Sequence, residues 1–205
     1  MRKKSEARRE AILQTALEVF REMGFEAASM SQIAARVGGS KATLYNYFSS
    51  KEELLMEAMT VSARQQGQDI IALIGAPGDI ERQLQRFVSS VLQLVATQNT
   101  LKLLRVAVSV SSHSNIGRHF YDLGTEVVWR HVANYLEQQV QRGVLKPEAP
   151  EILAMHLRCL CESDLFCLLL GACSPLRIKE ADEKAALLVS LFLRAHGATN
   201  APGSI

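Results

Sequence analysis

The chain has 205 residues, of which 48% are hydrophobic and 21% are charged, and its formal net charge is +2. This composition is that of an ordinary globular protein with one large core or two small ones. The most apolar uncharged run, residues 165–176, is about a dozen residues and falls short of the ~20 that span a bilayer. We therefore expect no membrane-spanning helix.

The charges are not evenly spread along the chain. Residues 1–51 carry nine Lys and Arg against five Asp and Glu, a net charge of +4, so the remaining residues carry −2. A basic end on a nearly neutral body favours local contact with a polyanion. The first ten residues are basic, but no apolar segment follows them, so a secretory signal is not expected. We expect a soluble, cytoplasmic protein.

Residues 5–24 predict an amphipathic helix that ends at Gly24. A short basic arm, Arg2 to Lys4, precedes it. Apolar residues at helical spacing form the face that we expect to be buried: Ile12, Leu13, Ala16, Leu17, Phe20 and Met23.

Residues 29–37 predict a second helix, which begins with a capping box between Ser29 and Gln32. Glycines 38 and 39 end it, because glycine enters the left-handed conformation of a C-terminal cap without steric cost. Ser40 then caps a short third helix whose buried side holds Leu44 and Phe48. The other side of this helix is left with mainly polar residues: Lys41, Thr43, Asn46 and Tyr47, with Tyr45 near the boundary.

A short helix with a cation, two hydroxyls and an amide on its exposed side suits the DNA major groove. Spacing alone is equally consistent with any helical hairpin that has polar outer faces. The sequence, however, resembles the helix-turn-helix of the TetR family of bacterial transcriptional regulators. The motif elements that carry this resemblance are Ser29, Ile33-Ala34, Gly38 to Ser40, Thr43 to Phe48, and Ser50 to Leu54. Gly39 departs from the pattern, since many members have a side chain there.

The resemblance implies that this segment binds double-stranded DNA. The residues expected to face bases are Ser31, Lys41, Ala42, Thr43 and Asn46, among which Ala42 and Thr43 suit a thymine methyl group. The residues expected to hold phosphates are Ser29, Tyr47 and Lys51. Tyr45 is also expected to bind DNA, with the group that it contacts left open.

A second capping box, Ser50 with Glu53, opens a helix that runs towards Leu73. In the family, this connecting helix transmits ligand-driven movement to the DNA-binding domain. The segment Gly75 to Gly78 is the clearest break in the chain, and Asp79 caps the helix after it.

Five further helices are predicted, with no confident strand and no repeat. Their ranges are 79–97, 100–112, 115–142, 149–171 and 176–196, and Pro175 fits the first position of the last one. The predicted fold class is all-α, with a DNA-binding domain at 1–51 and a connecting helix at 51–74. A regulatory and dimerisation domain is expected at 79–196, followed by a disordered tail at 197–205.

The regulatory segment is rich in apolar residues with isolated polar groups. In the family, the corresponding helices enclose a mostly apolar pocket for a small effector. The candidate lining residues are Phe87, Val91, Leu104, Arg105, Phe120, Leu123 and Val127. Each of them is also consistent with an ordinary core or edge position.

The last two predicted helices carry more apolar surface than one internal face requires, which predicts a homodimer interface. The candidate interface residues are Leu165, Leu169, Leu188 and Phe192. Two-fold pairing would place two recognition helices at least one DNA turn apart, so a near-palindromic operator is expected. The alternative is that both helices are buried within one subunit.

All four cysteines, Cys159, Cys161, Cys167 and Cys173, lie in one apolar stretch without a CxxC pair. His156 and Cys159 could share a metal ion, but buried positions in a core are the preferred interpretation. We therefore expect no metal and no cofactor.

No catalytic motif is present, so an enzyme is not expected. An enzyme would require Arg105, Glu162 or Asp164 to converge in one pocket. The preferred function is a ligand-responsive, homodimeric transcriptional regulator acting as a repressor. An effector-independent regulator or activator, and more remotely a helical small-molecule enzyme, are the alternatives.

Overall fold

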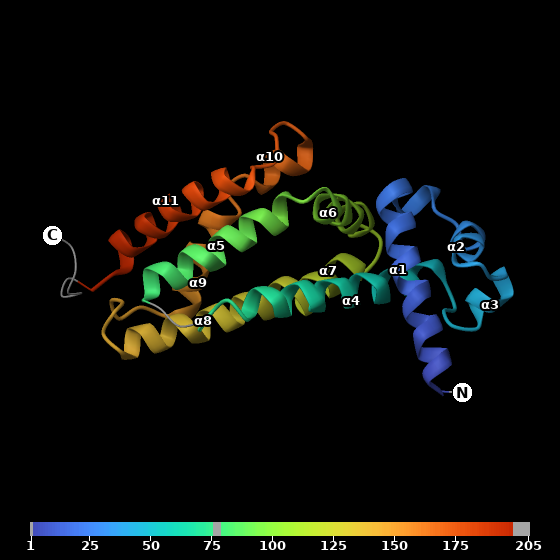
Figure 1. Cartoon of the computed structure of the whole chain (residues 1–205), viewed down its shortest axis with the longest axis horizontal. Helices are drawn as coiled ribbons and strands as arrows, with labels where there is room; N and C mark the ends of the chain where they lie inside the picture. The colour runs from blue at the N-terminus through green and yellow to red at the C-terminus, as the bar shows by residue number, and fades with distance from the viewer. Residues whose placement is uncertain (1, 76–78, 199–205) are drawn as a thin grey trace. The chain divides into compact units, whose positions relative to one another are not determined.

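A computed structural model describes residues 2–75 and 79–198 of the chain, which form eleven α-helices and one short π-helical turn (Figure 1). No strand occurs within these ranges, and an isolated antiparallel bridge joins Leu145 to Gly197. The predicted all-α class is confirmed. Within the same ranges, no helix is both long and apolar enough to cross a membrane. Residues 199–205, most of the predicted tail, lie outside the described residues.

The chain divides into two compact units. Unit 1 comprises residues 1–65 and 98–124, and unit 2 comprises residues 66–97 and 125–205. The long helix α4 (Lys51–Ile71) contributes to both. The predicted domains separate residues 1–51 from 79–196, whereas in the structure the segment 98–124 packs with the N-terminal helices.

Unit 1 is built around α1, which contacts both α2 and α6. Its elements, besides the first part of α4, are α1 (Arg2–Ala27), α2 (Met30–Val37), α3 (Lys41–Tyr45), α6 (Gln98–Val110) and α7 (Ile116–Phe120), followed by the π-helical turn η1 (Tyr121–Thr125). Apolar residues of α6, among them Leu103 and Val106, join the same core cluster as those of α1. This burial is why the segment after α5 belongs to unit 1 rather than to unit 2.

The end of the first helix is set by Gly24, as predicted. Its φ of 78° and ψ of 170° break the helical path, and Phe25 beyond the break returns to the core. One predicted core residue, Met23, is wrong, because its side chain is exposed while Val19 is buried. Since α1 is covered on two sides, by α2 and by α6, its buried arc is wider than the single predicted stripe and reaches Val19.

Unit 2 is a layered bundle in which α5 runs along α11 and α8 packs on α9 (Figure 1). Its elements, besides the end of α4, are α5 (Ile80–Ala96), α8 (Glu126–Gln141), α9 (Pro150–Cys161), α10 (Leu165–Leu170) and α11 (Ile178–His196). In its core, the rings of Phe87 and Trp129 meet edge to face, with centroids 5.7 Å apart. Asp79 caps α5 by accepting a hydrogen bond from the Arg82 N–H, as predicted.

Two predicted helices are irregular in the structure. The segment 115–142 is helical from α7 to α8 but contains the π-helical turn η1, and the segment 149–171 is interrupted between Cys161 and Leu165. At this interruption, Glu162 pairs with Arg158 while Asp164 pairs with Lys184 of α11. These ion pairs hold the chain where the helix changes course, and hydrophobic periodicity does not detect such a break.

The role predicted for Pro175 is wrong. Helix α11 begins at Ile178, and its N-cap residue Arg177 donates its backbone N–H to Glu180. Pro175 therefore precedes the helix, and the proline at a first helical position is Pro150, in α9. Both prolines satisfy the same local rule, so only the backbone path distinguishes them.

Candidate nucleic-acid interface

Helix α2 has the termini that its sequence predicts. Ser29 accepts a hydrogen bond from the Gln32 N–H at 3.3 Å, and the Gln32 side chain accepts one from the Ser29 N–H at 2.9 Å, which confirms the capping box. At the other end, Gly38 adopts a left-handed conformation with φ of 75° and donates to carbonyls of the last turn. Both ends of this short helix are thus fixed by local hydrogen bonds.

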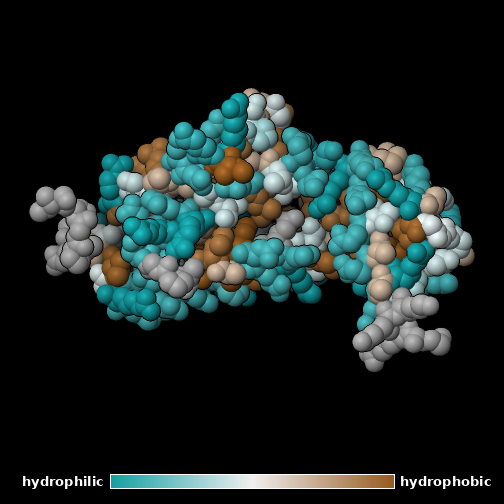
Figure 2. Space-filling view, in the orientation of Figure 1, coloured by the Kyte–Doolittle hydropathy of each residue, from teal (hydrophilic) through white to brown (hydrophobic). Residues whose placement is uncertain are grey.

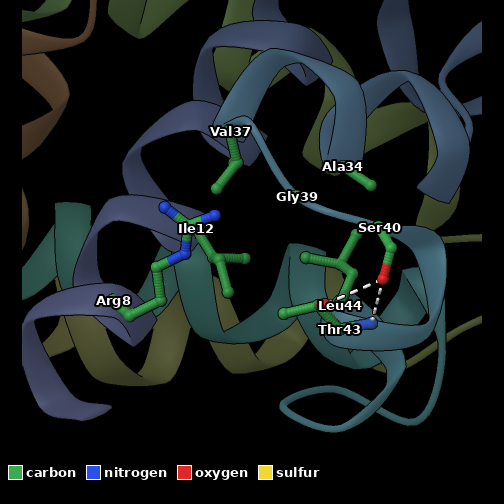
Figure 3. Close-up of a pocket in the computed structure, with 8 residues that line it drawn as sticks. All are labelled: Arg8, Ile12, Ala34, Val37, Gly39, Ser40, Thr43 and Leu44. Carbon is green, nitrogen blue, oxygen red and sulfur yellow. Dashed lines mark hydrogen bonds between the residues drawn. The ribbon is translucent and has the colours of Figure 1, made fainter. Parts of the chain in front are cut away.

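Helix α3 follows at once and is also capped. The Ser40 hydroxyl accepts from the Thr43 N–H at 3.0 Å and lies 2.8 Å from the Thr43 hydroxyl (Figure 3). Leu44 and Phe48 are buried in the unit 1 core, as predicted. The helix itself is shorter than expected and ends at Tyr45, so Phe48 reaches the core from the turn after it.

The outer side of α3 brings together most of the residues predicted to face DNA bases. Lys41, Ala42 and Asn46 are exposed, and Ser31 is exposed on α2, whereas Thr43 is half-buried and bonded to Ser40. Tyr45 is exposed as well, and the Lys41 ammonium lies 5.8 Å from its ring centroid. The result is a compact polar surface on a helix whose opposite side is anchored in the core by Leu44.

The three residues predicted to hold phosphates have other contacts within the chain. The Ser29 hydroxyl lies in the α2 capping box, and Tyr47 packs partly against the core. The Lys51 ammonium donates to the carbonyls of Phe25 and Ala28 at 2.8 and 3.1 Å and lies 4.2 Å from the Phe25 ring centroid. Lys51 therefore also ties the first turn of α4 to the end of α1.

The N-terminus of α4 differs slightly from its predicted capping box. The Ser50 hydroxyl accepts from the Glu53 N–H at 3.1 Å, as expected. The Glu53 carboxylate, however, accepts both the hydroxyl and the N–H of Ser49, each at 2.6 Å. These bonds, first that of the Ser49 hydroxyl, hold the pKa of Glu53 below its ordinary value. The box is shifted by one residue because the chain turns sharply after Phe48.

Two arginines around α2 and α3 are paired with carboxylates in the described part of the chain, whereas Lys41 of α3 is not. Arg9 pairs with Glu57 and lies over the Phe48 ring, and Arg36 pairs with Glu22, whose pKa this hydrogen bond lowers. Within the described ranges, no carboxylate pairs with Lys41. The paired arginines brace the unit, while the charge on α3 is left for an external anion.

The residues predicted to line an effector pocket are distributed over both units. Phe87, Val91 and Val127 belong to unit 2, where the first two are buried in the core. The other four, on α6, α7 and η1, belong to unit 1: Leu104, Arg105, Phe120 and Leu123. Neither unit alone contains the predicted set, and Arg105 is exposed.

Sequence reasoning missed one polar group in the core of unit 2. The hydroxyl of Tyr135, on α8, is buried and forms no hydrogen bond within the described part of the chain. Burial raises the pKa of this phenol to about 12, so the group remains a neutral donor at ordinary pH. A tyrosine on a helical apolar face carries no sequence signal that distinguishes this state from an exposed one.

Two of the four residues predicted for the dimer interface are buried within their own subunit. Leu188 and Phe192 are only 6% and 1% exposed, because they pack into the core of their own subunit. The exposed apolar residues of α11 are instead Leu187 and Leu191, at 58% and 39%, and Ile178 at the start of the helix. Others lie on α9 and α10: Ile152, Met155, Phe166 and Leu170. The predicted Leu165 and Leu169 are half-buried.

A surface hollow of about 460 Å³ lies between α9 and α11. Its walls include His156, Cys159 and His196, and the two imidazoles are stacked with Nδ1 of His156 3.1 Å from Nε2 of His196. Over the described ranges, no three His, Cys, Asp or Glu side chains are placed to hold a metal ion. Burial raises the pKa of Cys161 to about 12, so this thiol stays protonated.

The residues considered for an enzyme are distributed over both units. Glu162 and Asp164 have different cationic partners, Arg158 and Lys184. Arg105 belongs to unit 1, whereas the two acidic residues belong to unit 2. Neither unit therefore contains all three of the residues whose convergence would indicate an enzyme site.

Two family descriptions match the chain. Residues 12–58 match bacterial regulatory proteins of the tetR family, and residues 82–198 match the C-terminal domain of AefR-like transcriptional repressors. The uncharacterized HTH-type transcriptional regulator YhgD of Bacillus subtilis (strain 168) is 24% identical over 152 residues, covering 72% of this chain and 76% of YhgD.

Solved structures are similar over almost the whole chain. A protein described as a TetR-family transcriptional regulator from Mesorhizobium loti MAFF303099 is 25% identical, with a TM-score of 0.88, and the match covers 95% of this chain and 98% of that one. The flavonoid-responsive regulator FrrA is also 25% identical, with a TM-score of 0.73 over 96% of this chain and 100% of FrrA.

Proposed function

Because this chain belongs to the TetR family of bacterial transcriptional regulators, we propose that it is a repressor released from its DNA operator by a small, mostly apolar effector. The observation that carries the DNA-binding part is the exposed polar side of α3, whose ends and buried side are fixed by caps and core contacts. Such a helix can enter the major groove without rearranging. We refer to α3 as the recognition helix.

We assign base contacts to Ser31, Lys41, Ala42, Thr43 and Asn46. The Thr43 hydroxyl is bonded to Ser40, so its methyl group is the part suited to a thymine methyl. We assign phosphate contacts to Ser29, Tyr47 and Lys51. We also include Tyr45, which is exposed beside Lys41, as a contact to either a base or a phosphate. Lys51 retains one N–H for a phosphate after its two carbonyl bonds.

The test begins with a duplex selected from a random pool by the full-length protein. Lys41→Ala and Asn46→Ala should each weaken binding to this duplex by about 1–3 kcal/mol and relax its sequence preference. Lys179→Ala is the matched control, because it removes an exposed charge on α11 that pairs with Glu183. Unchanged affinity and preference in both α3 variants would exclude α3 as the recognition helix.

The phosphate assignment is tested separately in a salt titration. Lys51→Ala should weaken binding to all sequences alike and flatten the plot of log affinity against log salt by about one unit. Because Lys51 also ties α4 to the end of α1, the thermal stability of this variant is measured in parallel. An unchanged salt slope in a folded variant would remove Lys51 from the interface.

Several observations support the effector part of the proposal. The matched C-terminal description is that of transcriptional repressors, and the similar FrrA is a flavonoid-responsive regulator. Within unit 2, the buried Tyr135 hydroxyl lacks a hydrogen-bond partner among the described residues. A pocket for an apolar effector needs a few such polar groups for orientation, so we add Tyr135 to the candidate effector contacts.

The homodimer part rests on the exposed apolar residues of α9, α10 and α11. Figure 2 shows apolar side chains reaching the surface among polar ones over the helices of unit 2. Phe166 is 75% exposed, and an apolar surface of this extent fits a self-complementary contact with a second copy. A two-fold dimer implies a near-palindromic operator.

A further inference from the structure

The turn between α2 and α3 contains two adjacent glycines with different roles. Gly38 has a φ of 75°, a conformation that favours glycine, and a Cβ built there would meet no described atom within 4 Å. Gly39 is not among the glycines with positive φ, so its backbone would accept another residue. A Cβ at Gly39 would instead lie 3.0 Å from Nη2 of Arg8. At position 39 it is therefore the Arg8 guanidinium, rather than the backbone conformation, that a side chain would disturb.

The group that fills this space is the guanidinium of Arg8, which reaches over from α1. Its Nη2 donates to the Gly38 carbonyl at 3.1 Å. In Figure 3, Arg8 and Ile12 extend from α1 towards the turn at Gly39, across from Ser40, Thr43 and Leu44. The hollow that these residues line is too small to admit a water molecule. The guanidinium is therefore packed against the turn rather than separated from it by solvent.

Arg8 also differs in its charge environment from two nearby arginines, Arg9 and Arg36. Arg9 and Arg36 pair with Glu57 and Glu22, whereas no ion pair within the described ranges includes Arg8. The bond to the Gly38 carbonyl is thus not in competition with a carboxylate. A hydrogen bond from a charged donor is among the stronger ones in proteins.

From this geometry we propose that Arg8 is a positioning residue for the recognition helix and that Gly39 is the residue that admits it. By holding the Gly38 carbonyl, Arg8 fixes the residue two positions before the N-cap Ser40, and thereby the point where α3 begins. Neither residue is among the assigned DNA contacts. The inference rests on the proposed DNA binding through α3.

The test is a double-mutant cycle in the full-length protein, with the duplex selected by the wild type. Arg8→Ala should lower affinity for this duplex about tenfold, because the turn loses a charge-assisted hydrogen bond. Gly39→Ala should produce a similar loss, because the new methyl group displaces the end of a flexible side chain at little cost to the fold. The double variant should bind no worse than either single variant, since both remove the same contact.

Each variant is also measured on a duplex of scrambled sequence, at several salt concentrations and by thermal unfolding. A positioning role predicts that affinity for the selected duplex falls more than that for the scrambled one, with the salt slope nearly unchanged. Equal losses on both duplexes, with a slope lower by about one unit, would make Arg8 a plain phosphate contact and overturn the proposal. Additive losses in the cycle would overturn it as well.

Lys41→Ala in the same assay separates this inference from the proposed function. If Lys41→Ala weakens binding while the Arg8 and Gly39 variants bind like the wild type, only the positioning role is wrong. If none of the three affects binding, recognition through α3 itself is wrong.

Discussion

The recognition helix α3 and the C-terminal helix α11 are held in place in opposite ways. Helix α3 has five residues, far below the length at which a helix is stable alone, and depends on the Ser40 cap and the buried Leu44. Helix α11 has nineteen residues and is held by packing against α5 and α9. Local hydrogen bonds at the cap therefore add to one buried residue in α3, whereas burial along its whole length holds α11.

This difference affects what each surface can do. The outer side of α3 is polar and borders a turn fixed by Gly38 and Arg8, which suits recognition by hydrogen bonds. The outer side of α11 carries Leu187 and Leu191, which suits association by burial. Removal of the α3 cap should therefore weaken DNA binding, and a change in the exposed apolar surface of α11 should weaken dimer formation.

The largest effect is expected at the exposed side of α11. Leu187→Glu combined with Leu191→Glu should convert the proposed dimer into a monomer, because burying the two charges in the interface would cost several kcal/mol. Sedimentation velocity gives the assembly state, and circular dichroism verifies that the helices remain. Val108→Glu, at an exposed apolar residue of α6 in unit 1, is the matched control and should leave the dimer intact. A folded double variant that stays dimeric would place the interface elsewhere.

The buried side of the same helix should respond as a core. Phe192→Ala should lower the free energy of unfolding by about 3–5 kcal/mol, as expected for a large buried side chain, whereas Leu187→Ala should have a much smaller effect. Urea unfolding at two protein concentrations measures both, and the Phe192 loss should not depend on concentration. Equal losses of unfolding free energy in the two variants would contradict the assignment of Phe192 to the buried side of α11 and of Leu187 to its exposed side.

The coupling free energy between effector binding and operator binding should be intermediate in size. If an effector releases DNA, operator binding must weaken effector binding by the same factor, about 1–3 kcal/mol in free energy. A thermal-shift screen that begins with flavonoids identifies a ligand, and calorimetry with and without the selected duplex measures the coupling. Tyr135→Phe should weaken ligand binding if the Tyr135 hydroxyl orients the ligand. Equal ligand affinity in both states would exclude release by that compound.

A smaller effect is expected at the cap of the recognition helix. Ser40→Ala should cost about 1 kcal/mol of stability, because the Thr43 N–H loses its acceptor, and should weaken operator binding through fraying of α3. Ser190→Ala, at an exposed position inside α11, is the control and should cost nothing. A stable Ser40 variant with native operator affinity would show that the cap does not maintain the DNA-binding surface.

The smallest effect is expected from pH. Burial, followed by the nearby His156, lowers the pKa of His196 below 6.5, and Lys146 acts in the same direction while Glu148 opposes it. Because the unfolded chain binds this proton more readily, stability should fall as pH drops through about 6.5. His196→Gln should reduce this loss in thermal unfolding between pH 7.5 and 5.5. His131→Gln, on the exposed side of α8, should not reduce it.

Most of the local structure around the proposed DNA-binding surface could be predicted, because its signals are local. The Ser29 box, the left-handed Gly38 and the Ser40 cap are each decided by residues within four positions of one another. The bonds of Lys51 to Phe25 and Ala28 could not be predicted in this way, since they join positions more than twenty residues apart. The hydrogen bond from Arg8 to the Gly38 carbonyl could not be predicted for the same reason.

For unit 2, the sequence by itself determined that the segments are helical and that α11 is apolar on more than one side. It could not determine which leucines face inwards, because Leu187, Leu188 and Leu191 have the same chemistry. The tertiary structure decided this, with Leu188 turned into the core and Leu187 and Leu191 exposed. Hydrogen bonds at helix ends are short-range and directional, so the sequence specifies them. Hydrophobic burial has no direction of its own, so the side that becomes the core is decided only when α5 and α9 pack against α11.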